Sequence, residues 1–211
     1  MKERIYWINR FALLLCKGVK NIQELKLTSP MPPSVNHYTS VRTVMKNGKP
    51  LSIVYETKEA KEYKKKFKKI IEEQVKIQGW DMEVNATQHF YIDAIFYFDR
   101  IDKDCSNYEK CLDDAITETQ LIWKDDNVAL FRPQRIYYDS KNPRIELTIY
   151  PCDYTGVFDN TSQLEQFESR CIGCNRYRRN CSILQKAKEG RIQEEIVGLK
   201  CNKYKPIKQP E

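Results

Sequence analysis

Apolar and polar residues alternate most regularly between residues 89 and 100. Five apolar side chains occupy every second position there: Phe90, Ile92, Ala94, Phe96 and Phe98. A period of two places such side chains on one face of a β-strand. Weaker patterns predict further strands over residues 25–28, 52–55, 127–138 and 144–150. The last two are predicted to pair as a hairpin, with its turn at Ser140-Lys-Asn-Pro143.

Helical spacing follows Thr57, which is a plausible N-cap residue. Apolar side chains recur at intervals of three and four at Ala60, Tyr63, Phe67, Ile70 and Ile71, and Gly79 ends the pattern. A second helix is predicted over residues 108–119, and Lys46-Asn-Gly-Lys49 is typical of a hairpin turn. The order of elements predicts an α+β (mixed α/β) fold, in which two helices back one sheet.

After Pro151 the sequence changes from strand and helix patterns to a polar segment, which is followed by a segment that contains several cysteines. A length of 211 residues allows one ordinary core with a small appendage. We expect the following units: an ill-defined leader (1–24), a folded core (25–151), a polar linker (152–165), a cysteine-bearing module (166–205) and a tail (206–211).

Composition and charge narrow the class of protein. No apolar run approaches the roughly 20 residues that a membrane span requires, and residues 11–16 are too short a run for a secretory signal. We therefore expect a cytoplasmic protein without a membrane partner. The net charge is +7, and residues 165–211 hold 11 basic against 6 acidic side chains. A basic chain with an acidic centre favours a nucleic-acid enzyme, with divalent cations in the middle and phosphates around the edge.

The acidic centre is a group of aspartates near the end of the clearest strand. It comprises Asp102, Asp104, Asp113, Asp114, Asp125 and Asp126. Converging carboxylates suit Mg²⁺, which prefers hard oxygen ligands. Lys110 lies among them in sequence and is suited to stabilise negative charge in a transition state. From spacing alone, the alternative that these aspartates cap helices and turns stays open.

Four sequence segments then point to a known family. They are Ser29-Pro-Met-Pro-Pro-Ser-Val-Asn-His37, Asp104-Cys-Ser-Asn107-Tyr-Glu-Lys110-Cys-Leu-Asp-Asp114-Ala115, Trp123-Lys-Asp125-Asp126 and Asn142-Pro-Arg144. In this order they resemble the RusA-type Holliday junction resolvases, known largely from phages and prophages, over roughly residues 25–151. The resemblance implies a homodimeric, Mg²⁺-dependent endonuclease that cuts four-way or branched DNA symmetrically in recombination or repair.

The resemblance also implies roles for individual residues. Catalytic roles fall to Asp104, Lys110 and Asp126, and Mg²⁺ ligation to Asp102, Asp104, Asp125 and Asp126. DNA contacts fall to Asn36, His37 and Asn107, although an ordinary hydrogen-bonded loop residue is the favoured interpretation of His37. The family usually has Asp-x-Asp directly before the asparagine, whereas this chain has Asp104 and Ser106. Either Ser106 replaces the second aspartate, or Asp102 and Asp104 form a shifted pair.

The appendage carries a second candidate metal site. The spacing Cys171-x2-Cys174-x6-Cys181-x19-Cys201 suits a closed, structural Zn²⁺ site. An iron–sulfur cluster and a set of free thiols are the alternatives. Within the same segment, Arg176, Arg178 and Arg179 flank Tyr177 and are candidates for DNA contacts.

Two points remain open at this stage. The basic run of Lys64, Lys65, Lys66, Lys68 and Lys69 is either a solvated helix face or a track for DNA. The function is either that of a junction endonuclease or that of a non-catalytic, zinc-containing DNA-binding protein with a degenerate nuclease site.

Overall fold

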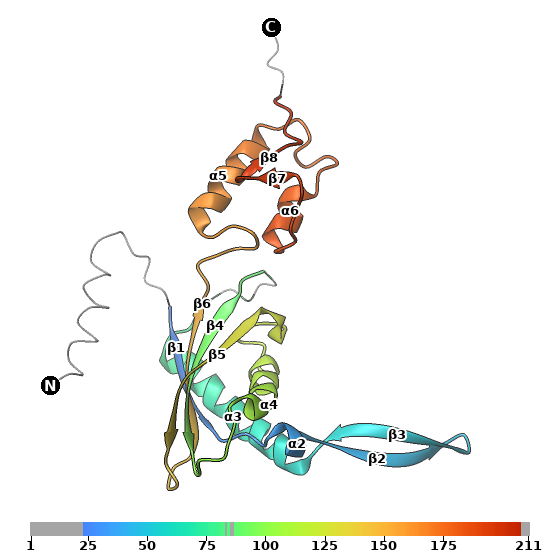
Figure 1. The fold of residues 1–211 in the computed structure, drawn as a ribbon, viewed down its shortest axis with the longest axis vertical. Coiled ribbons are helices and arrows are strands. Elements are labelled where there is room, and N and C mark those ends of the chain that lie inside the picture. The colour runs from blue at the N-terminus through green and yellow to red at the C-terminus, as the bar shows by residue number, and fades with distance from the viewer. Residues whose placement is uncertain (1–22, 83, 85–86, 208–211) are drawn as a thin grey trace, which may run out of the picture.

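The computed structural model describes residues 23–82, 84 and 87–207, so most of the predicted leader lies outside the described residues. A four-stranded sheet forms the centre of the core (Figure 1). Its strands, in spatial order, are β1 (Leu25–Pro30), β6 (Arg144–Pro151), β4 (Phe90–Phe98) and β5 (Ala129–Tyr138). No helix in the described part of the chain is long and apolar enough to cross a membrane.

The predicted hairpin between β5 and β6 is wrong. Both strands exist, but β4 lies between them, parallel to β5 and antiparallel to β6. The connection after β5 passes the end of β4, where the Asp139 amide donates to the Phe98 carbonyl at 2.7 Å. The helix-facing side chains of β4 are all fully buried, which suits a central strand and not an edge strand.

One edge of the sheet is formed by β5 and is irregular. Its register against β4 shifts between Ala94 and Ile95, so Gln134 is an extra residue next to Pro133. Proline has no amide hydrogen to donate, and such irregularities are tolerated at edge strands.

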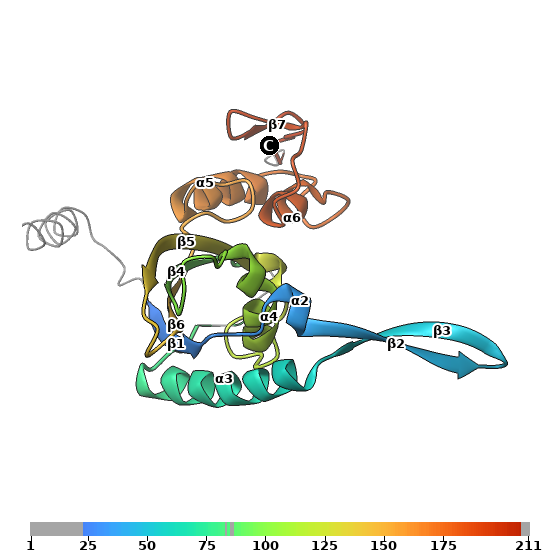
Figure 2. The ribbon, with the colours of Figure 1, turned by 60° about the horizontal axis from the view of Figure 1, so that its bottom comes forward.

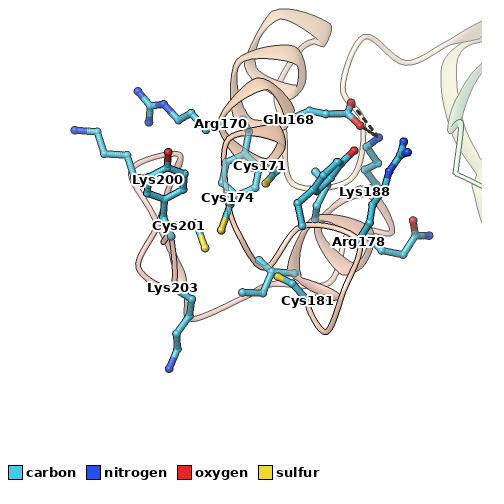
Figure 3. Close-up of a pocket in the computed structure, with 16 residues that line it drawn as sticks. Glu168, Arg170, Cys171, Cys174, Arg178, Cys181, Lys188, Lys200, Cys201 and Lys203 are labelled. Carbon is cyan, nitrogen blue, oxygen red and sulfur yellow. Dashed lines mark hydrogen bonds and ion pairs between the residues drawn. The ribbon is translucent and has the colours of Figure 1, made fainter. Parts of the chain in front are cut away.

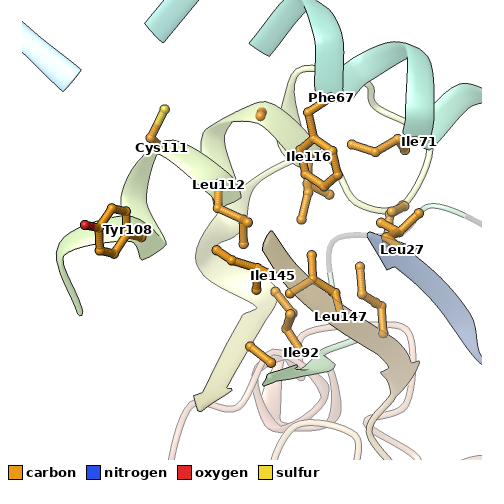
Figure 4. Close-up of a cluster of buried hydrophobic side chains, with 14 of the residues drawn as sticks. Leu27, Phe67, Ile71, Ile92, Tyr108, Cys111, Leu112, Ile116, Ile145 and Leu147 are labelled. Atoms are coloured by element: carbon orange, nitrogen blue, oxygen red, sulfur yellow. The ribbon is translucent and has the colours of Figure 1, made fainter. Parts of the chain in front are cut away.

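Both predicted core helices cover the same face of the sheet, as Figure 2 shows. The Thr57 side chain caps α3 (Lys58–Ile77) by accepting from the Ala60 amide. The second helix, α4 (Ser106–Thr117), packs beside it. Figure 4 shows side chains of both helices meeting those of the sheet. Among the buried members are Leu27, Phe67, Ile71, Ile92, Leu112, Ile116, Ile145 and Leu147. Burial of these side chains is the main contribution to core stability.

A separate β-hairpin projects from the core. A short helix, α2 (Val35–Tyr38), leads into β2 (Thr39–Lys46), which pairs along its length with β3 (Lys49–Glu56). The predicted turn is confirmed: Asn47 and Gly48 both have positive φ, at 53° and 74°, as this tight turn type requires.

The C-terminal module has its own small buried cluster. It contains α5 (Thr161–Ile172), α6 (Ile183–Lys188) and the short pair β7 (Ile196–Val197) and β8 (Lys200–Cys201). The buried cluster of this module consists of Phe158, Phe167 and Ala187. Phe158 comes from the segment predicted as a linker, so part of that segment packs with the module.

Candidate active site

One helix presents the central lysine and aspartate of the candidate site. α4 buries Leu112 and Ile116 against the core, while Lys110 and Asp114, four residues apart, share a more exposed side. The Lys110 Nζ donates to Asp114 Oδ1 and to Asp126 Oδ2, both at 2.8 Å. The lysine therefore bridges two carboxylates that are 12 positions apart in the sequence.

The bridge changes the protonation of its members. The hydrogen bonds that Lys110 donates to Asp114 and Asp126 raise the pKa of Lys110 above its usual value. Burial alone would raise the pKa of Asp114, but bonds from Lys110 and Tyr38 hold it below its usual value. At neutral pH the site thus contains a lysinium between carboxylates.

The two adjacent aspartates after α4 have different roles. Asp125 precedes a single 3-10 turn, η1 (Asp126–Val128), and its Oδ1 accepts from the Asn127 amide at 3.0 Å. Asp126 instead reaches Lys110. This capping bond by Asp125 directs its neighbour into the site.

Asp113 is the most unusual carboxylate in the cluster. It is 7% exposed, and its Oδ1 has no hydrogen-bond partner. Burial, together with the charges of Glu109 and Asp126, raises the pKa of Asp113 to about 8. A buried, unpaired carboxylate oxygen beside other carboxylates is a hard donor that suits a cation.

Two residues that the sequence analysis did not assign to the site form hydrogen bonds in or next to it. The Tyr38 hydroxyl donates to Asp114 Oδ2 at 2.5 Å. Lys64 is 6% exposed and donates to Glu56 at 2.5 Å and to Glu118 at 2.7 Å. Its ammonium also lies 5.1 Å from the centre of the Tyr38 ring. Lys64 is therefore not part of an exposed basic track.

The helical period of the sequence could have predicted that Lys64 is buried. It lies four residues after Ala60 and three before Phe67, on the buried side of α3. The Tyr38 contact had no such signal, because it joins residues 76 positions apart.

Within the described part of the chain, the other predicted core-site residues make no hydrogen bond or ion pair with the Lys110 bridge. Asp102 pairs with Arg100 at 2.8 Å, and Asp104 Oδ1 accepts from the Ser106 amide at 3.1 Å at the start of α4. Asn36 and His37 are exposed on α2, with His37 4.0 Å from Glu59. Asn107 is in the first turn of α4 and is half-buried.

Among the described residues, no three His, Cys, Asp or Glu side chains are arranged as ligands of one metal ion. In the core, the Lys110 ammonium supplies the positive charge between Asp114 and Asp126. The donor set nevertheless fits Mg²⁺, because it consists of hard carboxylate oxygens and includes the unpaired oxygen of Asp113.

The four C-terminal cysteines line one pocket, shown in Figure 3. They are Cys171, Cys174, Cys181 and Cys201, and all are free thiols. Burial and the three neighbouring thiols raise the pKa of Cys171 to about 11. The Lys205 amide donates a hydrogen bond to Cys174 Sγ at 3.4 Å. A hydrogen bond of this kind stabilises a thiolate. The fold thus gathers thiols that are up to 30 positions apart.

The three arginines predicted to contact DNA lie on the loop after Cys174. Arg178 and Arg179 are exposed and Arg176 is half-buried. The Arg178 guanidinium lies 5.2 Å from the centre of the Tyr177 ring. Such a pair offers both a cation and an aromatic face to a ligand.

Comparison with known proteins identifies a family model that matches the chain. The family model described as Endodeoxyribonuclease RusA matches residues 30–150. That range contains the hairpin, α3, α4 and the complete Lys110 bridge. No curated protein matches the chain.

Proposed function

Because the chain belongs to the RusA family of endodeoxyribonucleases, we propose that it resolves four-way or branched DNA junctions by Mg²⁺-dependent hydrolysis. Family membership makes the chain an endonuclease that acts on DNA phosphodiester bonds. The bridge of Lys110 between Asp114 and Asp126 carries the proposal, because it joins the lysine and aspartates of the motif in space. This arrangement favours an enzyme over a non-catalytic DNA-binding protein.

We expect Asp104 and Asp126 to hold Mg²⁺, with further oxygens from Asp102, Asp113 or Asp125. A carboxylate is a better Mg²⁺ ligand than the Ser106 hydroxyl. When bound, the metal acidifies a water and polarises the scissile phosphate.

Lys110 has two roles in this proposed mechanism. Before substrate binds, its ammonium neutralises Asp114 and Asp126. During phosphodiester cleavage, its N–H groups donate to phosphate oxygens whose negative charge is growing. Tyr38 keeps Asp114 oriented through the hydrogen bond to Oδ2.

A cleavage assay on a synthetic four-way junction, with and without Mg²⁺, tests this function, with linear duplex as the DNA control. We expect Asp104→Asn and Asp126→Asn to abolish cleavage while junction binding stays within a few-fold. Lys110→Ala should lose about 10²–10³ in rate, which is typical of one lost transition-state donor. Asp81→Asn is the matched control, because Asp81 is exposed and outside the cluster.

Two outcomes would count against the proposal. Cleavage by Asp126→Asn at the wild-type rate would show that the site is wrongly assigned. Junction binding by the unaltered protein without any cleavage in Mg²⁺ would favour the DNA-binding alternative.

The quaternary state and location follow from the same proposal. Two symmetric cuts across a four-way junction need two active sites related by a two-fold axis, so we propose a homodimer. We also propose that the protein acts in the cytoplasm, which agrees with the free state of all seven described cysteines.

For the C-terminal module, we propose one structural Zn²⁺ held by Cys171, Cys174, Cys181 and Cys201. Their convergence on one pocket supports this, as does the small buried cluster of the module. Four thiolates leave no open position for water, so the metal would stabilise the fold and take no part in hydrolysis. The exposed arginines on the same loop would then contact DNA phosphates.

Metal analysis of the purified protein tests the zinc site. We expect one zinc per chain and no brown absorption of an iron–sulfur cluster. Cys174→Ser should lose the metal and expose the module to protease while the core stays folded. Cys105→Ser should retain it, because Cys105 lies in the core. Absence of zinc and iron, with a module that resists protease in chelator, would contradict the proposal.

A further inference from the structure

The projecting hairpin is the largest feature that the proposed mechanism does not use. We call residues 39–56 the arm. In the described part of the chain its two strands pair only with each other, and it extends away from the body in both Figures 1 and 2. Apolar side chains along it are open to solvent, including Val41 (62% exposed), Met45 (69%) and Val54 (65%). An isolated two-stranded hairpin is marginally stable in water, so such a surface indicates a binding partner.

The register divides the arm into two faces of different chemistry. One face has no charged side chain apart from Glu56 at the base of the arm. It carries the cross-strand pairs Val41–Val54, Thr43–Ser52 and Met45–Pro50. The other face carries the pairs Ser40–Tyr55, Arg42–Ile53, Val44–Leu51 and Lys46–Lys49. The Arg42 guanidinium lies 5.5 Å from the centre of the Tyr55 ring. The second face therefore combines cations with apolar and aromatic side chains.

Charge identifies the class of partner. From residue 39 to residue 55 the chain has three basic side chains and no acidic one. An uninterrupted positive ribbon complements a polyanion, and the major groove of B-DNA admits a two-stranded ribbon of this kind. Apolar side chains can also pack against bases where stacking is broken, as at a branch point.

The base of the arm is attached to the candidate active site. Tyr38, directly before β2, donates to Asp114. Glu56, the last residue of β3, accepts from Lys64, which also binds Glu118 at the C-terminal end of α4. The arm therefore starts at the edge of the cluster that would perform hydrolysis.

We propose that the arm is a DNA-binding element that grips the duplex next to the scissile phosphate. This inference rests on the proposed function for the identity of the DNA substrate. Each strand has eight residues, so the arm is about 27 Å long and spans roughly eight base pairs. Its basic face contacts phosphates, and its uncharged face contacts bases.

The test is junction binding measured over a series of salt concentrations. The variant Arg42→Gln/Lys46→Gln/Lys49→Gln removes the three positive charges of the arm and leaves its turn intact. The matched control Lys26→Gln/Lys76→Gln/Lys141→Gln removes three charges from exposed positions elsewhere. We expect the arm variant to weaken binding about tenfold or more at low salt and to reduce the salt slope by about 3. The control should change both quantities much less.

Two results would overturn the inference. One is an arm variant whose affinity and salt slope equal those of the control. The other is a protein with residues 41–54 replaced by a two-residue turn that becomes monomeric while the full chain is dimeric, because the arm would then bind a second copy. Failure of the proposed function is separate: the full chain would not cut junctions, whatever the binding results for the arm.

Discussion

At the scale of single residues, Asp113 is a buried carboxyl group that the fold holds in its neutral, protonated form. Its pKa is raised to about 8 by burial and by Glu109 and Asp126. The folded protein therefore holds this proton more tightly than the unfolded chain does. Asp113 contributes its full stabilisation at pH values below about 4, which is the pKa of an aspartate in the unfolded chain. This stabilisation falls as the pH rises from about 4 to about 8.

Asp113→Asn should remove this pH dependence, because asparagine resembles the protonated acid. In chelator, the variant should be more stable than the unaltered protein, and the difference should grow between about pH 4 and pH 8 and then level off. Thermal unfolding across that range measures it, with Asp81→Asn as a control that should show no such trend. A stability difference that stays constant with pH would contradict the assignment.

Sequence reasoning grouped side chains that lie close together along the chain. It placed Lys110, Asp114 and Asp126 in one cluster, and hydrogen bonds join them in the structure, while their catalytic and metal-binding roles stay predictions. Tyr38 was missed because its contact with Asp114 depends on the packing of α2 against α4. Asp102 and Asp104 were grouped with Asp126 from the same motif, but in the structure their bonds go to Arg100 and to the Ser106 amide.

At the scale of elements, Gly156 determines how the segment before α5 meets α6. Its φ is +58°, and a Cβ at this position would lie 2.0 Å from the Ala187 carbonyl oxygen. The neighbouring Val157 amide donates to that same oxygen at 3.0 Å, so the two backbones cannot separate without losing this bond.

Gly156→Ala should therefore destabilise the module by more than the roughly 1–3 kcal/mol of backbone strain alone. Gly198→Ala is the matched control, since Gly198 also has positive φ (53°) but has open space around it. Hydrogen exchange over residues 155–205 would separate the two variants. Equal exchange rates in both would show that the close approach to α6 is unimportant.

The elements themselves were largely predictable, but their pairing was not. The alternation in β4 and the helical period of α3 are strong local signals, and both elements appear as expected. Pairing of β5 with β6 was inferred from their short connection. The structure places β4 between them, because its fully apolar face needs the most buried position in the sheet.

At the scale of the whole molecule, the proposed reaction requires two chains. Light scattering at micromolar concentration should give twice 25.1 kDa for the free protein. The complex with a four-way junction should exceed the mass of the DNA by the same amount. Junction binding should weaken steeply with salt, since several phosphates are neutralised. A monomer under both conditions would weigh heavily against symmetric resolution.

The irregular edge of the central sheet limits how chains can associate. Along β5, Pro133 offers no amide hydrogen, and the extra residue Gln134 breaks the spacing of the remaining donors and acceptors. A strand from another molecule cannot form a continuous ladder there. The irregular edge therefore disfavours open-ended polymerisation of the core through β5.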